Sequence, residues 1–113
     1  MIVGTGIDIT LISRMEQSMK KENFMGKIFT PVERDYIAGK GGHAQTAAGI
    51  FCAKEAYLKA LGKGIGAISF SSIEILHHES GAPYMQSDVG RVHVSISHMG
   101  DIAIAHVIIE SED

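Results

Sequence analysis

Asp8, Glu55 and Lys59 are the residues whose types and spacing suit chemistry at a phosphate group. Glu55 and Lys59 are four residues apart in an Ala-rich segment, so a helix would place both on one face. Asp8 lies in an apolar segment, where a carboxylate is costly to desolvate unless it is paired or bound to a cation. Two carboxylates completed by water and phosphate oxygens are a usual way to hold Mg²⁺, and a nearby lysine would reach the same phosphates.

Each of these residues also has an ordinary structural interpretation. Asp8 is equally compatible with an exposed acid near the end of a strand. Glu55 and Lys59 would form a surface ion pair on any exposed helix, worth about a few tenths of a kcal/mol. The residue types alone leave both interpretations open.

A glycine-rich loop at residues 62–66 contains Lys63 and Gly64 as candidate phosphate-binding residues. The loop is not a P-loop, because G-x-x-x-x-G-K-[ST] is absent. It also follows the expected C-terminus of a helix, where the helix dipole repels anions. A phosphate there would have to be held by Lys63 or by turned backbone amides.

The histidines do not have the spacing of a zinc site. His77 and His78 are adjacent on a predicted strand and point to opposite faces, and His93 and His98, five residues apart, also oppose each other. His98 ends a predicted strand, where polar groups often serve a site. An ordinary turn residue fits His98 equally well.

Composition and charge exclude several classes of function. Ten Lys+Arg against thirteen Asp+Glu give a net charge of −3, and the chain has no Trp, so a general nucleic-acid-binding surface is not expected. No apolar run approaches the ~18 residues of a membrane span. The single cysteine, Cys52, excludes an intramolecular disulfide framework and is most simply a small core residue. We therefore expect a cytoplasmic protein.

Basic residues gather in the first third of the chain, among methionines. In a chain of negative net charge, such a local surface is a candidate docking site for an acidic partner, although a solvated helix face is the ordinary alternative. The basic residues are Arg14, Lys20, Lys21 and Lys27, and the methionines are Met15, Met19 and Met25.

These residues must be positioned by a small set of elements. Alternation over residues 1–11 predicts a strand that carries Asp8 on the face cleared of bulk by Gly4 and Gly6. We expect the fold class α+β, with one domain of residues 1–113 in which an antiparallel sheet packs on one long helix. The other expected elements are a helix from an N-cap at Ser13 to about Lys21, a helix with a capping box at Thr30 and an end at Gly39, a long helix over 43–61, and strands over 72–78, 84–86, 91–97 and 102–110.

The last predicted strand, residues 102–110, is apolar on both faces. An antiparallel strand with one wet face should alternate between apolar and polar residues. The second face is therefore covered either by another subunit or, in a central strand, within the same chain.

Four motifs, taken together and in order, resemble a known family. They are Gly6-Ile7-Asp8-Ile9, then Phe51-Cys52-Ala53-Lys54-Glu55-Ala56 with Lys59-Ala60-Leu61-Gly62, then Gly64-Ile65-Gly66, and finally His93-Val94-Ser95-Ile96-Ser97-His98. In this order they resemble the bacterial holo-acyl-carrier-protein synthases, the small 4′-phosphopantetheinyl transferases. The resemblance covers nearly the whole chain.

The resemblance implies an activity and a fold. Such enzymes transfer the phosphopantetheine arm from coenzyme A to a serine of an apo acyl carrier protein and release adenosine 3′,5′-bisphosphate. Asp8 and Glu55 match the family's Mg²⁺ ligands, and Lys59 matches its helix lysine. Thr10 stands where larger transferases carry an acid, so a water is expected as a further ligand. The residues leave open which base takes the serine proton.

The resemblance also implies how substrates and subunits meet. Small members are homotrimers with active sites shared between neighbouring subunits, and their first helix docks the carrier protein. The expected coenzyme A-binding residues are Lys54, Lys59, Lys63, Gly64 and His98. The expected carrier-binding residues are Arg14, Lys20 and Lys21.

This sequence departs from the family pattern at basic positions. Ile50 stands where an arginine is usual, and Gly41-Gly42-His43 replaces a basic loop. Lys40, Lys54 and Lys63 are the candidates to replace these charges. The departures motivate an alternative, a relative that binds a carrier protein without transferring to it. A second alternative is a small phosphohydrolase that uses the same carboxylates.

Overall fold

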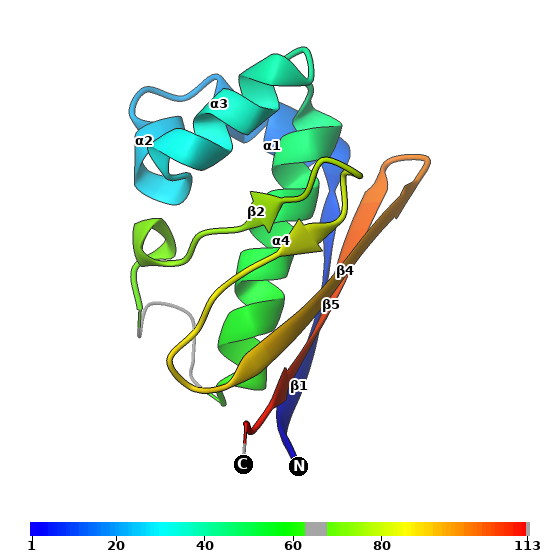
Figure 1. Cartoon of the computed structure of the whole chain (residues 1–113). Helices are drawn as coiled ribbons and strands as arrows, with labels where there is room; N and C mark the ends of the chain where they lie inside the picture. The colour runs from blue at the N-terminus through cyan, green and yellow to red at the C-terminus, as the bar shows by residue number, and fades with distance from the viewer. Residues whose placement is uncertain (63–67, 113) are drawn as a thin grey trace.

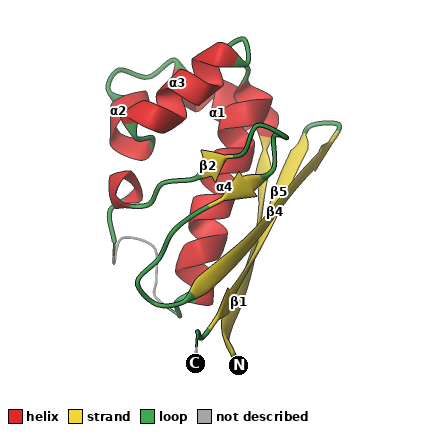
Figure 2. Cartoon of the chain, viewed as in Figure 1, coloured by secondary structure: helices red, strands yellow, loops and turns green. Residues whose placement is uncertain are grey.

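The computed structural model describes residues 1–62 and 68–112. The predicted fold class is confirmed: an antiparallel sheet packs on one long helix (Figures 1 and 2). The elements are β1 (Ile2–Leu11), α1 (Ile12–Met19), α2 (Phe24–Ile28), α3 (Pro31–Gly39), α4 (Ala44–Ala60), the 3₁₀ helix η1 (Phe70–Ser72), β2 (Leu76–His77), β3 (Pro83–Tyr84), β4 (Arg91–Met99) and β5 (Ile102–Glu110).

The main sheet has three antiparallel strands in the order β1-β5-β4. Asp8 of β1 and Ile96 of β4 both pair with Ala105, so they flank the same residue of the central strand. Helix α4 runs along one face of this sheet, and α1, α2 and α3 gather near its N-terminal end (Figure 1). The short pair β2–β3 forms a separate sheet that runs past α4.

Glycines allow α4 to approach β1 closely. A Cβ added to Gly4 would lie 1.9 Å from the carbonyl oxygen of Ala60, and one added to Gly6 would lie 1.9 Å from that of Ala56. Any side chain at either position would force the helix away from the strand. Asp8 follows on the same face, as the alternation predicted, and it is buried rather than exposed.

The apolar face of β1 points away from α4 and is exposed. Val3, Ile7 and Ile9 retain 50%, 56% and 60% of their accessible surface. The neighbouring central strand β5 buries Ala103 and Val107 against the helix side, while its other apolar face is only partly covered. Within the described residues, the chain itself therefore does not fully cover the outer face of β5.

Helix α1 begins differently from the prediction. Ser13 is not its N-cap: Leu11 occupies that position and makes no side-chain cap. The carboxylate of Asp101, in the β4–β5 turn, accepts instead from the Ser13 backbone N–H at 2.8 Å and from the Ser13 hydroxyl at 2.6 Å. A residue 88 positions away in the sequence thus accepts a hydrogen bond from a free backbone N–H at the start of α1. The prediction had assigned this role to a local cap.

The other element predictions are confirmed in part. The capping box of Thr30 and Glu33 forms, and α3 ends at Gly39 as expected. The strand predicted over 72–78 is wrong, because the segment starts in η1 and only Leu76–His77 pairs in a sheet. Its partner is Pro83–Tyr84 rather than residues 84–86. None of the helices in the described ranges has the length and apolarity needed to cross a membrane.

Candidate active site

Asp8, Glu55 and Lys59 meet where β1 packs on α4. Asp8 is only 9% exposed. The Lys59 ammonium donates to Asp8 Oδ1 at 3.1 Å and to the Ile7 carbonyl oxygen at 2.9 Å, while about half of its side chain stays in solvent. The fold therefore brings together the acid of one strand and the acid and lysine of a helix about fifty residues further along.

The two carboxylates of this cluster act on each other. Partial burial raises the pKa of Glu55 to about 7, and the charge of Asp8, with a hydrogen bond to it, adds to the shift. Lys59 opposes the shift but is a single positive charge against two acids. The site holds more negative charge than its own cation balances, which favours binding of a further cation.

Cys52 lies next to the same carboxylates and is chemically inert. Its Sγ lies 3.5 Å from the Ala103 carbonyl oxygen and is fully buried. Burial, followed by the charge of Asp8, raises the pKa of the Cys52 thiol to about 12. A thiol with so high a pKa stays protonated, so it packs as the core residue that the sequence indicated.

Few side chains of the described residues are placed to bind a metal ion together. Within residues 1–62 and 68–112, no group of three or more His, Cys, Asp and Glu side chains is placed to hold a metal ion. Asp8 and Glu55 are thus a pair, without a third protein ligand. Such a pair fits Mg²⁺, which keeps several waters and takes the rest of its ligands from phosphate oxygens.

Lys54 is not a cofactor-binding residue, and this prediction is wrong. Its side chain is fully buried and its ammonium pairs with the Glu33 carboxylate. It also donates to the carbonyl oxygens of Ile28 at 2.7 Å and Phe70 at 2.9 Å. These three oxygens use all of the ammonium's hydrogens, so none is left for a ligand.

The remaining predicted cofactor residues are placed differently. Lys63 and Gly64 lie outside the described residues. His98 is the penultimate residue of β4, its Nε2 lies 3.0 Å from the Gln45 side-chain nitrogen, and both residues line a cavity of about 200 Å³. Tyr36 and His77 line the same cavity, with stacked rings 3.7 Å apart. They are 41 positions apart, and no local pattern in the sequence signalled that they meet.

The carboxylate pair and the His98 cavity lie on different sides of α4. The pair faces β1, whereas the cavity is lined by Gly49 and Ile50 of α4 and by Ile96 of β4. Successive helical residues turn by about 100°, so Ile50 and Glu55 point about 140° apart. Within one chain, helix α4 therefore lies between these two places.

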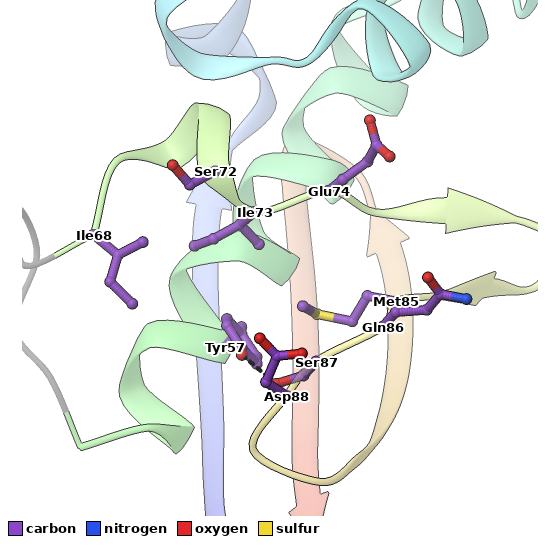
Figure 3. Close-up of a pocket in the computed structure, with 9 residues that line it drawn as sticks. All are labelled: Tyr57, Ile68, Ser72, Ile73, Glu74, Met85, Gln86, Ser87 and Asp88. Atoms are coloured by element: carbon purple, nitrogen blue, oxygen red, sulfur yellow. Dashed lines mark hydrogen bonds between the residues drawn. The ribbon is translucent and has the colours of Figure 1, made fainter.

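A cavity of about 280 Å³, which sequence reasoning missed, opens beside Tyr57 (Figure 3). The Tyr57 hydroxyl lies 2.6 Å from the Ser87 hydroxyl at its wall. Two acids, Glu74 and Asp88, also line it. Their negative charge makes this cavity unsuited to a phosphorylated ligand.

The predicted carrier-binding residues Arg14, Lys20 and Lys21 are exposed, on α1 and just after it. The methionines predicted to share their surface are not free: Met15 is buried, and Met19 and Met25 pack against the core. The surface around α1 is therefore basic rather than methionine-rich.

Comparison with known proteins shows the family to which the chain belongs. Residues 4–107 match the model of the 4′-phosphopantetheinyl transferase superfamily. The chain belongs to this superfamily.

Individual relatives show which members of this superfamily the chain is similar to. The chain is 41% identical to a holo-[acyl-carrier-protein] synthase of Clostridium perfringens, over 99% of this chain and 96% of that protein. It is 46% identical to one from a Geobacillus species, over 97% and 98% of the two chains. A crystal structure of the Bacillus anthracis holo-(acyl-carrier-protein) synthase in complex with CoA (3′,5′-ADP) superposes with a TM-score of 0.89, at 42% identity and over 99% of both chains.

Proposed function

We propose that this chain transfers 4′-phosphopantetheine from coenzyme A to a serine of an apo acyl carrier protein. The observation that carries the proposal is the cluster of Asp8, Glu55 and Lys59, assembled across β1 and α4 within a chain that belongs to the transferase superfamily. A cytoplasmic location is part of the proposal, and the free thiol of Cys52 is compatible with it.

Mg²⁺ is the metal we propose for the carboxylate pair. Asp8 and Glu55 would hold it, because their combined charge exceeds that of Lys59; burial, and after it the charge of Asp8, raises the pKa of Glu55. When bound, the ion would neutralise charge on the pyrophosphate oxygens of the donor.

The chain's own side chains position the reacting groups and stabilise the charge that develops on phosphate. The serine oxygen attacks the phosphorus that bears the pantetheine arm, the bond from that phosphorus to the nucleotide's phosphate breaks, and the serine proton passes to a base. Lys59 is held by the Ile7 carbonyl at the edge of the site, where its ammonium can meet the developing charge on phosphate. Asp8 and Glu55 are the described carboxylates beside this place that can accept the proton.

We also propose that the enzyme is a homotrimer whose active sites are shared between subunits. The exposed apolar face of β1 and β5 supports an interface with other copies. The two half-sites on different sides of α4 support sharing, because a neighbouring copy can bring its His98 cavity to the carboxylate pair of the first.

The carrier protein is proposed to dock on α1. Arg14, Lys20 and Lys21 give this exposed region a positive charge within a chain of net charge −3. Long-range attraction of this kind speeds the encounter with an acidic partner and weakens as salt rises.

The test mixes the protein with an apo acyl carrier protein, coenzyme A and Mg²⁺ and records the intact mass of the carrier. We expect a gain of one phosphopantetheine that disappears with EDTA. Glu55→Gln should abolish the gain and remain folded, whereas Glu79→Gln, an exposed acid in a turn, should not change it. Carrier binding without any mass gain would favour the binding-only alternative, and cleavage of coenzyme A without a carrier would favour the phosphohydrolase.

A further inference from the structure

One residue of the β4–β5 turn, Asp101, ties this turn to the start of helix α1. Its Oδ1 accepts a hydrogen bond from the Ser13 backbone N–H at 2.8 Å, and its Oδ2 accepts one from the Ser13 hydroxyl at 2.6 Å. Its backbone carbonyl oxygen accepts a third, from the N–H of Ile12, at 2.8 Å. Both oxygens of the carboxylate are therefore committed to the first turn of α1.

This contact lies at the junction between the proposed catalytic strand and the proposed docking helix. Strand β1 carries Asp8, and α1 begins on the residue directly after the last residue of β1. Arg14 of the docking region lies in the first turn of α1, which Asp101 holds. Because no loop separates the two elements, the direction that α1 takes from β1 is set at this one junction.

The contact with Asp101 matters more for the orientation of α1 than for the stability of the fold. Asp101 and Ser13 are both exposed, so the groups that lose a partner can bond to water instead, and little stability is lost. Met15 is buried and keeps α1 against the core. The backbone hydrogen bond from Ile12 also survives any change of the Asp101 side chain. Loss of the carboxylate should therefore loosen the direction of α1 without detaching the helix.

The negative charge of Asp101 by itself opposes the docking of an acidic partner. Arg14, Lys20 and Lys21 make the region around α1 positive, and an acid at its edge weakens the attraction that they exert. If only this charge mattered, removing it should improve the reaction with the carrier. If the hydrogen bonds to α1 matter, removing them should impair it. The two roles of Asp101 thus predict effects of opposite sign.

We propose that Asp101 is a positioning residue for the carrier protein: by holding the first turn of α1, it sets where the carrier's serine arrives relative to Asp8. This inference rests on the proposed function, in which the carrier docks on α1. It assigns a role to a residue that belongs neither to the docking surface nor to the carboxylate pair. A displacement of about 1 Å at a reacting atom can cost up to about a hundredfold in rate, so a modest turn of α1 is enough to matter.

The test measures kcat and KM with varied carrier and with varied coenzyme A for the wild type and two variants. Asp101→Ala removes both acceptor oxygens and should lower kcat/KM for the carrier about tenfold, while KM for coenzyme A stays unchanged. Asp101→Asn removes the same charge but keeps one acceptor oxygen, so it should lose less. Glu16→Gln, which removes an exposed acid of α1 itself, is the matched control and should leave kcat/KM for the carrier equal or higher.

Ser13→Ala shows whether the effect of Asp101 passes through α1. This variant removes the hydroxyl that donates to Oδ2 and keeps the backbone N–H, so by itself it should lower kcat/KM for the carrier less than Asp101→Ala does. In the Asp101→Ala background it should have no further effect, because the shared contact is already gone. Additive losses would mean that Asp101 acts through another group, and would overturn the inference.

Three kinetic results would also contradict a positioning role. They are an unchanged or higher kcat/KM for the carrier in Asp101→Ala, an equal loss in Asp101→Ala and Glu16→Gln, and a parallel rise of KM for both substrates. The last would indicate a general loss of structure, which thermal unfolding of the same variants would register. No transfer by the wild type would instead refute the proposed function itself.

Discussion

Glu55 carries a carboxylate whose protonation changes near neutral pH. Its pKa of about 7 lies above the ordinary value of 4.5, so between these values the folded chain holds a proton that the unfolded chain releases. The raised pKa of Glu55 therefore contributes fully to the stability of the folded state below about pH 4.5. This contribution is lost as the pH rises to about 7.

Replacing Glu55 should remove this dependence on pH. In EDTA, the Tm of the wild type should fall relative to that of Glu55→Gln as the pH rises from about 4.5 to 7. Thermal unfolding of the two proteins across this range measures the difference, in which contributions common to both proteins cancel. Curves that stay parallel would show that Glu55 has an ordinary pKa.

The buried ion pair of Lys54 leads to a prediction about stability that does not involve catalysis. Lys54→Met leaves the buried Glu33 carboxylate without its cation, which should cost about 3–5 kcal/mol of unfolding free energy. Lys54→Met combined with Glu33→Gln should recover part of that loss, because the unpaired charge is gone. Urea unfolding of the single and double variants tests this coupling, and additive losses would contradict it.

The sequence could predict that Asp8, Glu55 and Lys59 belong to one site, because each lies in a local motif. It could not place Lys54, although this residue directly precedes Glu55. Adjacent helical residues point about 100° apart. The partners that hold Lys54 in the core come from Ile28, Glu33 and Phe70, which only the folded chain brings together.

At the scale of elements, the contact between β1 and α4 decides the geometry of the site. Gly6→Ala would place a Cβ 1.9 Å from the Ala56 carbonyl oxygen, so the helix must move away from the strand. Glu55 and Lys59 would move with it, and we expect both lower stability and at least a tenfold loss of kcat/KM.

Gly39→Ala is the matched control for this contact. A Cβ at Gly39 meets no atom within 4 Å, so it should leave activity unchanged. Urea unfolding and the carrier mass assay, applied to both variants, separate a local contact from a general effect of adding a methyl group. Wild-type activity in Gly6→Ala would contradict a requirement for close packing.

Helices α3 and α4 were predictable because their signals are local: alanine-rich composition for α4 and a capping box for α3. Helix α2 was not predicted. The start of α1 was not, because Asp101 reaches Ser13 from the β4–β5 turn. The strand predicted over 72–78 failed for a related reason. Its Ile73 and Ile75 are buried in the core without a sheet partner for either residue.

At the scale of the whole molecule, the exposed sheet face predicts assembly. Ile9→Glu would place a charge at the centre of the proposed interface and should yield monomers by light scattering. Val32→Glu, which alters another exposed apolar residue, on α3, should leave the oligomer intact. A monomeric wild type would contradict the interface.

Shared active sites make a further prediction about mixtures. Glu55→Gln should disable the proposed half-site at the carboxylate pair, and His98→Glu should disable the proposed half-site at the His98 cavity by repelling the donor's phosphates. Co-expression of the two variants should restore activity above that of either alone, because some interfaces then join two intact halves. No recovery would mean that each chain works alone.

The sequence predicted that both faces of the last strand are apolar, but it could not decide between burial within the chain and burial by another copy. The structure shows why: β5 is central and half-covered, and β1 beside it turns its small and polar face inward. An alternating pattern identifies the two faces of a strand, but it does not say which of them meets the helix.

The outward apolar face of β1 has a consequence for how the enzyme is assayed. If catalysis requires neighbouring copies, the rate per chain depends on the total protein concentration. Specific activity should then fall on dilution below the dissociation constant of the assembly and recover on concentration. A cell that makes little of this protein would regulate its activity through abundance alone, more steeply than in direct proportion.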